Sequence, residues 1–131
     1  MAFYRTKLFN RRTKGIGLTD DCLMKAAKEV ENGIFEADLG GGVIKKRIAL
    51  NNKGKSGGAR TVIFFRSGTH VFFADGWAKS NVKKGRKEIE DDILETYKDL
   101  ADMFLNYSET DIAQQIKHGL LSEVKNNEVK E

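Results

Sequence analysis

LGGGVIKKRIALNNKGKSGGARTVIFFRSGTHVFFADGWAK, residues 39–79, is the stretch that decides the fold of this 131-residue chain. It combines glycine-rich turns, two basic clusters and the most apolar run of the protein, and residues 39–74 contain no Asp or Glu. A segment that gathers cations and excludes anions is suited to bind a polyanion.

Alternation of side chains predicts that the stretch forms three antiparallel strands. On Val43–Leu50 the apolar positions that include Ile44 share one face, which we expect to be core. Lys45 and Arg47 fall on the opposite face, about 7 Å apart, and we expect that face to be open. The following residues, Asn51–Gly58, are predicted to form a loop.

The second and third strands, residues 59–66 and 70–79, are predicted to form a hairpin around a two-residue loop at Ser67-Gly68. In this register the numbers of paired residues sum to 135, so that Arg60 faces Asp75 and Asp75 orients the guanidinium. A one-residue slip would change which side chains meet. The residues that share this face are Arg60, Trp77 and Lys79.

Flanking segments complete an α+β pattern. Residues 3–10 alternate loosely and predict a short edge strand. Thr19 is placed to cap a helix that stops at Gly33, and an apolar stripe predicts the strongest helix over residues 89–105. Ser108 begins a further short helix, closed by Gly119. We therefore expect a small antiparallel sheet with N-terminal and C-terminal helices packed on it.

Size and composition predict one domain over residues 1–131, with a core of about 18–124 and a loose end at 125–131. The single Cys22 has no partner for a disulfide or a cysteine-based metal site, which fits a reducing cytoplasm. The sequence shows no signal peptide and no membrane-spanning run, so we expect a soluble cytoplasmic protein.

Charge is unevenly distributed along the chain. Residues 1–38 carry 7 basic and 6 acidic side chains, residues 39–87 carry 12 and 1, and residues 88–131 carry 4 and 12. This asymmetry predicts a nucleic-acid or phosphate surface in the middle of the chain. The alternative is that the basic and acidic segments pair with each other inside the fold, although surface ion pairs contribute little to stability.

The strings GGGVIKKRIA and KGKSGGAR, followed by a hairpin ending in GWAK and an amphipathic helix, resemble the RelE/ParE superfamily of bacterial toxins, nearest to HigB-like members. The resemblance runs from about Glu36 to Val124. It implies a microbial-RNase-like fold and metal-independent, cofactor-free cleavage of messenger RNA in the ribosomal A site. It also implies a cognate antitoxin, often a helix-turn-helix protein, through which alone the toxin would reach operator DNA.

The resemblance also implies roles for individual residues. Lys45 and Arg47 match the alternating basic pair of the RNA-cleaving members, Arg60 matches the arginine that contacts the scissile phosphate, and Lys79 matches a basic position at the end of the last strand. Where some members have a further arginine this chain has Ser80-Asn81, and the C-terminal tyrosine of some members has no obvious counterpart. The residues expected to bind RNA around this set are Lys46, Lys53, Lys55, Trp77 and Lys83.

Attack by a ribose 2′-OH requires a proton acceptor, a proton donor for the leaving 5′ oxygen and cations around the transition state. Because crowded cations disfavour the charged form of each, we expect Lys45 as the base, Arg47 and Arg60 as phosphate clamps, and Lys79 as acid or further clamp. Three alternatives remain at this point. They are a gyrase poison of the same fold, a nucleic-acid-binding adaptor, and a protein whose only partner is an acidic polypeptide.

Overall fold

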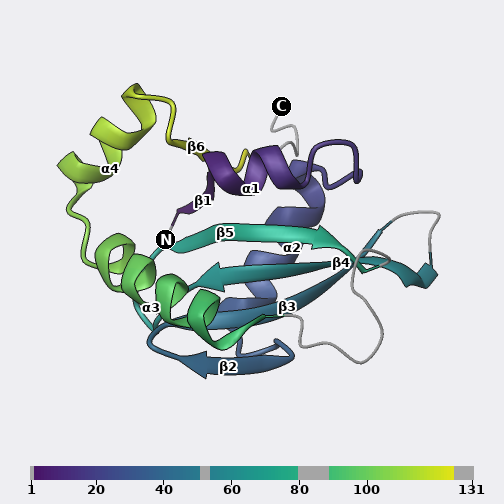
Figure 1. Ribbon diagram of the computed structural model, residues 1–131. Coiled ribbons are helices and arrows are strands. Elements are labelled where there is room, and N and C mark those ends of the chain that lie inside the picture. The colour runs from purple at the N-terminus through teal and green to yellow at the C-terminus, as the bar shows by residue number, and fades with distance from the viewer. Residues whose placement is uncertain (1, 51–53, 80–88, 126–131) are drawn as a thin grey trace.

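A six-stranded sheet in the order β2-β3-β4-β5-β1-β6 carries the fold (Figure 1). The computed structural model describes the chain apart from residues 1, 51–53, 80–88 and 126–131, and the side chains of residues 54–57 are also left undescribed. The elements in chain order are β1 Phe3–Thr6, α1 Lys7–Arg12, α2 Asp20–Glu31, β2 Ala37–Gly40, β3 Val43–Leu50, β4 Gly54–Phe64, β5 Val71–Ala78, α3 Asp91–Leu105, α4 Glu109–Lys117 and β6 Leu121–Glu123.

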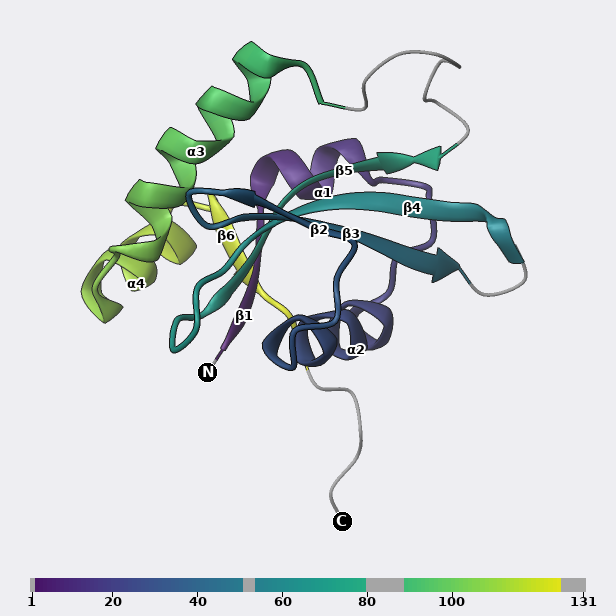
Figure 2. The ribbon, with the colours of Figure 1, turned by 90° about the horizontal axis from the view of Figure 1, so that it is seen from below.

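Helices cover the sheet on both faces (Figure 2). On one face, the apolar side of α2 packs on Ile44, Ile63 and their neighbours. On the other, which we call the α3 face, Tyr97 and Ala101 of α3 pack with a second buried cluster that includes Val43. The predicted α+β class is confirmed. We expected the face of β3 that carries Lys45 and Arg47 to be open. This is wrong at Val43, the first residue on that face, because α3 buries it completely.

The N-terminal segment differs from the predicted edge strand over residues 3–10. The strand ends at Thr6, whose hydroxyl accepts a hydrogen bond from the Phe9 amide and so caps α1. β1 is also not an edge strand, because it runs parallel to β5 and has β6 on its other side. Phe3 and Phe9 are buried, so the core begins well before residue 18.

α1 takes the place of a neighbouring strand along the second half of β5. The Thr6 hydroxyl donates to the carbonyl of Ala74 at 2.8 Å, and the Phe9 ring lies 5.5 Å from that of Phe73. Gly76 lies directly under the helix, because a Cβ atom there would be 2.9 Å from the Thr13 methyl group. The helix therefore satisfies and covers a strand edge that would otherwise be open.

The hairpin of β4 and β5 has the predicted turn but not the predicted register. The Thr69 amide donates to the Arg66 carbonyl around Ser67-Gly68, as expected. The ladder, however, resumes with Phe64 opposite Phe72, and a bulge at Ala74 then adds one further residue to β5. Relative to the predicted register, the pairing at the far end of the hairpin is shifted by two residues. Each side chain there therefore keeps the face that was predicted for it.

The helix boundaries follow the sequence signals closely. Thr19 caps α2 through the Cys22 amide, and Ser108 forms a reciprocal capping box with Asp111 at the start of α4. The short strands β2 and β6 were not predicted, and β4 begins at Gly54, inside the predicted loop. Strands of four and three residues carry too few positions for alternation to be recognised.

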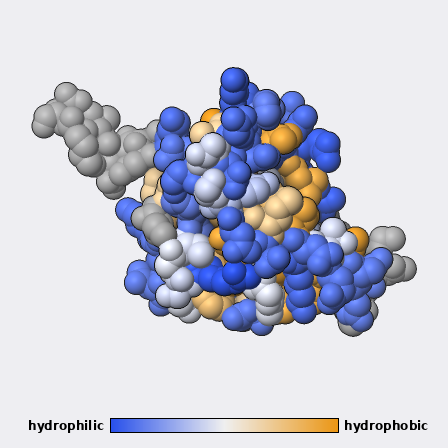
Figure 3. Space-filling view, turned by 90° about the vertical axis from the view of Figure 1, so that its left-hand side faces the viewer, coloured by the Kyte–Doolittle hydropathy of each residue, from blue (hydrophilic) through white to orange (hydrophobic). Residues whose placement is uncertain are grey.

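The end of the molecule that carries α4 is mostly hydrophilic, with apolar side chains between the polar ones (Figure 3). α4 buries only Ile112 and leaves Ile116 exposed. Met103 of α3 is also exposed. The outer side of α3 carries exposed carboxylates, so much of the acidic segment is solvated. Arg66 and Asp102 illustrate pairing between the basic and acidic segments, at 3.7 Å and with both side chains largely exposed, a type of contact that contributes little.

Candidate nucleic-acid interface

Three strands bring Arg47, Arg60 and Trp77 into one row across the α3 face. Arg47 of β3 is directly opposite Arg60 of β4, and Arg60 is directly opposite Trp77 of β5. Cross-strand partners point to the same side of a sheet, with Cβ atoms about 5 Å apart. The expectation that Arg60 and Trp77 share one face of the hairpin is confirmed, and the pairing of β3 with β4 adds Arg47 to that face. We call them the cross-strand row.

Two arginines directly opposite each other work against the stability of the sheet, because like charges at paired positions repel. Arg60 is moreover 8% exposed, so its charge is largely removed from water, while Arg47 is exposed. An anion bound between the two guanidinium groups would relieve the repulsion.

A second row on the same face lies one alternation away. Lys45 is opposite Val62, and Val62 is opposite Asp75. Lys45 is therefore about 7 Å along β3 from Arg47, and its side chain is half-buried. The predicted pairing of Arg60 with Asp75 is wrong, because the offset in the hairpin places Asp75 opposite Val62 and Trp77 opposite Arg60.

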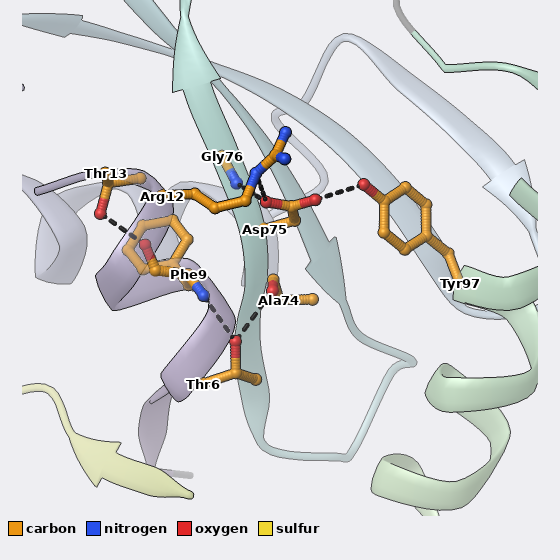
Figure 4. Close-up of polar contacts among 8 residues, drawn as sticks. All are labelled: Thr6, Phe9, Arg12, Thr13, Ala74, Asp75, Gly76 and Tyr97. Atoms are coloured by element: carbon orange, nitrogen blue, oxygen red, sulfur yellow. Dashed lines mark hydrogen bonds and ion pairs between the residues drawn. The ribbon is translucent and has the colours of Figure 1, made fainter. Parts of the chain in front are cut away.

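Asp75 is the centre of a buried polar network (Figure 4). Its Oδ1 accepts hydrogen bonds from the Gly76 amide and from Nε of Arg12, both at 2.8 Å, and its Oδ2 accepts one from the Tyr97 hydroxyl at 2.5 Å. Burial, and then the hydrogen bond to Asp75, raise the pKa of Tyr97 well above its ordinary value. The network joins α1, β5 and α3 next to the cross-strand row.

Lys46 does not suit the RNA-binding role expected for it. Alternation on β3 turns its side chain toward α2, where it is 4% exposed. Its ammonium group forms an ion pair with Glu29 at 2.9 Å and donates to the carbonyl of Ile34 at the same distance. Because the buried charge is fully engaged in holding α2 on the sheet, we remove Lys46 from the candidate interface.

The other expected contacts are only partly described. Lys79 follows the end of β5 directly and is half-buried. Lys53 and Lys83 lie outside the described residues, and Lys55 belongs to β4 without a described side chain. Their RNA-binding roles therefore stay predictions.

The imidazole of His70 connects three separate parts of the fold. Its Nδ1 accepts a hydrogen bond from the Ala2 amide at 3.0 Å, and its Nε2 lies 2.8 Å from a carboxylate oxygen of Glu109. Both ring nitrogens are thus occupied in joining the N-terminus and α4 to the start of β5. This geometry favours a structural role over proton transfer.

Two cavities of the described chain lie away from the centre of the row. One of about 340 Å³ lies between α2 and residues 47–50, and another of about 470 Å³ lies beside the turn of Gly40–Gly42. Arg60 and Trp77 line neither cavity. An open row of side chains across several strands suits an extended polymer better than an enclosed small molecule.

A mixed sheet between helices, with arginines and an aromatic side chain on one strand face, defines a small α+β protein with a candidate polyanion-binding face. The family model described as the RelE toxin of the RelE/RelB toxin–antitoxin system matches residues 1–124. The chain therefore belongs to the RelE toxin family, and the match includes the first 35 residues, which lie outside the stretch from about Glu36 to Val124 that carries the resemblance. A comparison with curated proteins finds no match.

Family membership implies a cognate antitoxin as a partner of this chain. Among the residues that the structure describes, no helix has the length and apolar character needed to cross a membrane.

The sequence analysis did not assign Arg12 or Tyr97 to the interface. In the sequence Arg12 is one of several cations that follow the first strand, and Tyr97 is one position of the apolar stripe over residues 89–105. Their link to Asp75 spans 63 and 22 residues, and local pattern carries no signal for contacts at such separations.

Proposed function

We propose that this toxin is an endoribonuclease that cleaves messenger RNA without a metal ion, by attack of a ribose 2′-OH on the adjacent phosphate. The observation that supports this most strongly is the cross-strand row, in which Arg47 and Arg60 occupy paired positions beside Trp77. A phosphodiester between the two guanidinium groups would be bound by charge-assisted hydrogen bonds. Trp77, partly buried against the core under α3, offers a face on which a base can stack.

The reaction assigns one role to each cation. Lys45, in its neutral form, accepts the proton of the 2′-OH as the 2′ oxygen forms its bond to phosphorus. Arg47 and Arg60 stabilise the negative charge that develops on the phosphate oxygens. The bond from phosphorus to the 5′ oxygen breaks, and Lys79 donates a proton to that oxygen. The products are a 2′,3′-cyclic phosphate and a free 5′-OH.

The same proposal includes the setting of the reaction. We expect cleavage in the ribosomal A site, as for HigB-like toxins, with Lys53, Lys55 and Lys83 contacting messenger or ribosomal RNA. Because the antitoxin must silence the enzyme, we expect it to cover the cross-strand row. We further expect it to be a helix-turn-helix protein, so that the toxin reaches operator DNA only through it.

The test is brief induction in cells, with growth and messenger-RNA 5′ ends recorded for wild type and variants. Lys45→Ala and Arg60→Gln remove groups of the proposed site. Lys28→Ala is the matched control, because Lys28 is an exposed cation on α2, on the opposite side of the sheet. We expect wild type and the control to arrest growth and to produce new 5′ ends within translated frames, and the two site variants to do neither while remaining soluble.

Other outcomes select other functions. Growth arrest without new RNA ends would favour a gyrase poison or a nucleic-acid adaptor. Cleavage of naked messenger RNA by purified protein, equal with and without ribosomes, would remove the ribosome from the proposal but keep the nuclease. If soluble wild-type protein neither arrests growth nor cuts RNA, the nuclease proposal is refuted.

A further inference from the structure

The side chain of Arg12 lies near the cross-strand row and is held by a contact between its Nε and the buried carboxylate of Asp75. Arg12 ends α1, its side chain is 48% exposed, and its Nε lies 2.8 Å from Oδ1 of Asp75, whose own side chain is 6% exposed. A buried carboxylate thus fixes Nε of a side chain about half of whose surface is open to solvent. Figure 4 shows the two terminal nitrogens of Arg12 on the far side of Nε from the carboxylate, toward the C-terminal half of β5.

This geometry differs from that of an ion pair that serves stability alone. Arginine and carboxylate pair most strongly when two N–H groups meet two oxygens. Here one oxygen of Asp75 takes Nε together with the Gly76 amide, and the other oxygen takes the Tyr97 hydroxyl. The carboxylate therefore sets the orientation of Arg12, and the terminal N–H groups remain directed away from it. Such a fork matches the oxygens of a phosphate.

Arg12 also lies on the correct side of the sheet. Asp75 points to the α3 face, because it accepts from Tyr97 of α3 and is opposite Val62, a residue of the cluster on that face. Two positions further along β5, about 7 Å away, is Trp77 of the cross-strand row. Arg12 thus borders the row at its β5 end, whereas Arg47 closes it at the β3 end.

We propose that Arg12 is a further phosphate-binding residue of the RNA interface, and that Asp75 is the positioning residue that presents it. The row would then hold one phosphate between Arg47 and Arg60, and Arg12 would contact a neighbouring phosphate on the other side of Trp77. This inference rests on the proposed function in so far as the ligand is RNA. It adds a contact from α1 that the strand pattern does not contain.

The experiment measures equilibrium binding of the full chain to a 2′-O-methyl RNA oligonucleotide, which lacks the reactive hydroxyl and is not cleaved. Binding is followed over a series of salt concentrations for wild type, Arg12→Gln, Arg12→Lys and Arg11→Gln. Arg11→Gln is the matched control, because Arg11 is also exposed and belongs to the same last turn of α1. It removes the same charge without touching the bond to Asp75.

For Arg12→Gln we expect about tenfold weaker binding, and a slope of log K against log salt that is smaller by about 0.7, the value for one phosphate contact on a single strand. Arg12→Lys should keep the slope but not the affinity, because an ammonium group cannot bond Asp75 and present a fork together. Arg11→Gln should stay within about twofold of wild type.

The positioning role of Asp75 is tested by comparing Asp75→Asn in wild type and in the Arg12→Gln variant. If Asp75 positions the guanidinium, Asp75→Asn lowers RNA affinity in wild type but has no further effect on affinity in Arg12→Gln. A purely structural role would lower the melting temperature in both backgrounds and leave affinity unchanged. Should Asp75→Asn fail to fold, the comparison of Arg12→Lys with Arg12→Gln carries the test.

The inference is overturned if Arg12→Gln binds RNA as wild type does, if Arg11→Gln and Arg12→Gln weaken binding equally, or if wild type does not bind the oligonucleotide. Its failure is distinct from failure of the nuclease proposal. Loss of binding in Arg12→Gln together with absence of cleavage by wild type would refute the nuclease and support the phosphate contact. Normal cleavage and binding by Arg12→Gln would refute the phosphate contact alone.

Discussion

Replacing Tyr97 by Phe removes one oxygen atom from the buried network around Asp75. The hydroxyl donates to a carboxylate oxygen at 2.5 Å, and the two residues are 6% and 4% exposed, so water cannot replace the lost donor. A hydrogen bond to a buried charged group is worth about 1.5–3 kcal/mol. We expect Tyr97→Phe to lower the free energy of unfolding by about 2 kcal/mol at pH 8. For a chain of this size the melting temperature would fall by about 8 °C.

The pH dependence of this loss provides a second, independent signature. The pKa of Tyr97 is raised by burial and by its bond to Asp75, so the folded state holds the proton when the unfolded state, with its tyrosine pKa of about 10, releases it. The stabilising effect of the hydroxyl is therefore complete below pH 10 and declines above it. By pH 11 the difference in stability between wild type and Tyr97→Phe should shrink from about 2 to less than about 1 kcal/mol.

Urea denaturation of both proteins at pH 8 and pH 11 measures these differences, because all other titrating groups are common to the pair. Tyr107→Phe is the matched control at pH 8. Tyr107 follows the end of α3 and is half-buried against the same cluster, and within the described residues its hydroxyl makes no hydrogen bond, so its loss should change stability by less than about 0.5 kcal/mol. Equal stability of wild type and Tyr97→Phe at pH 8, or an unchanged difference at pH 11, would refute the reasoning.

Three further stability predictions follow from contacts of the fold, each measured by urea denaturation. Glu29→Ala should cost about 2 kcal/mol because it leaves a buried ammonium group without its anion, whereas Lys46→Met, which removes that charge, should cost less than about 1 kcal/mol; the reverse order would contradict the assignment. Gly42→Ala and Gly68→Ala both place a side chain at positive φ, but only the first meets a neighbouring side chain of α3, at 2.6 Å, so it should be the more destabilising by about 1 kcal/mol; equal losses would exclude the clash. Thr6→Val should cost about 2 kcal/mol by removing both the cap of α1 and the bond to a β5 carbonyl, while Thr6→Ser should cost under about 1 kcal/mol; equal effects would show that the hydroxyl is not responsible.

Local signals were sufficient where one residue type has one structural consequence. Thr19 and Ser108 cap helices as the sequence indicates, and Gly68 forms the expected turn. Alternation on β3 correctly separated Lys45 and Arg47 from Ile44. These features depend on neighbours within four residues or on the period of a strand, both of which are visible in the sequence.

Features that depend on distant contacts could not be predicted. Residues 3–10 alternate like a strand, but Thr6 ends it because its hydroxyl finds a partner at Ala74, 68 residues away. For Lys46 alternation on β3 already indicated the core face of Ile44, and only its ion pair with Glu29 of α2 depends on a distant contact. The position of Asp75 depended on a bulge, and the extra residue that makes it leaves no distinct mark in the sequence.

That bulge has a consequence for how the strand can change. If Ala74 were paired in a regular ladder, Phe73 and Asp75 would point to the same side of the sheet; because it is bulged, Phe73 faces α2 while Asp75 and Trp77 face α3. The bulged residue thus separates the half of β5 that packs in the core from the half that carries the side chains of the interface. Because Val62 and Ile63 are consecutive on β4, deletion of Ala74 would leave a regular ladder in which both halves of β5 keep their faces, whereas deletion of any paired residue of the strand would turn one half over.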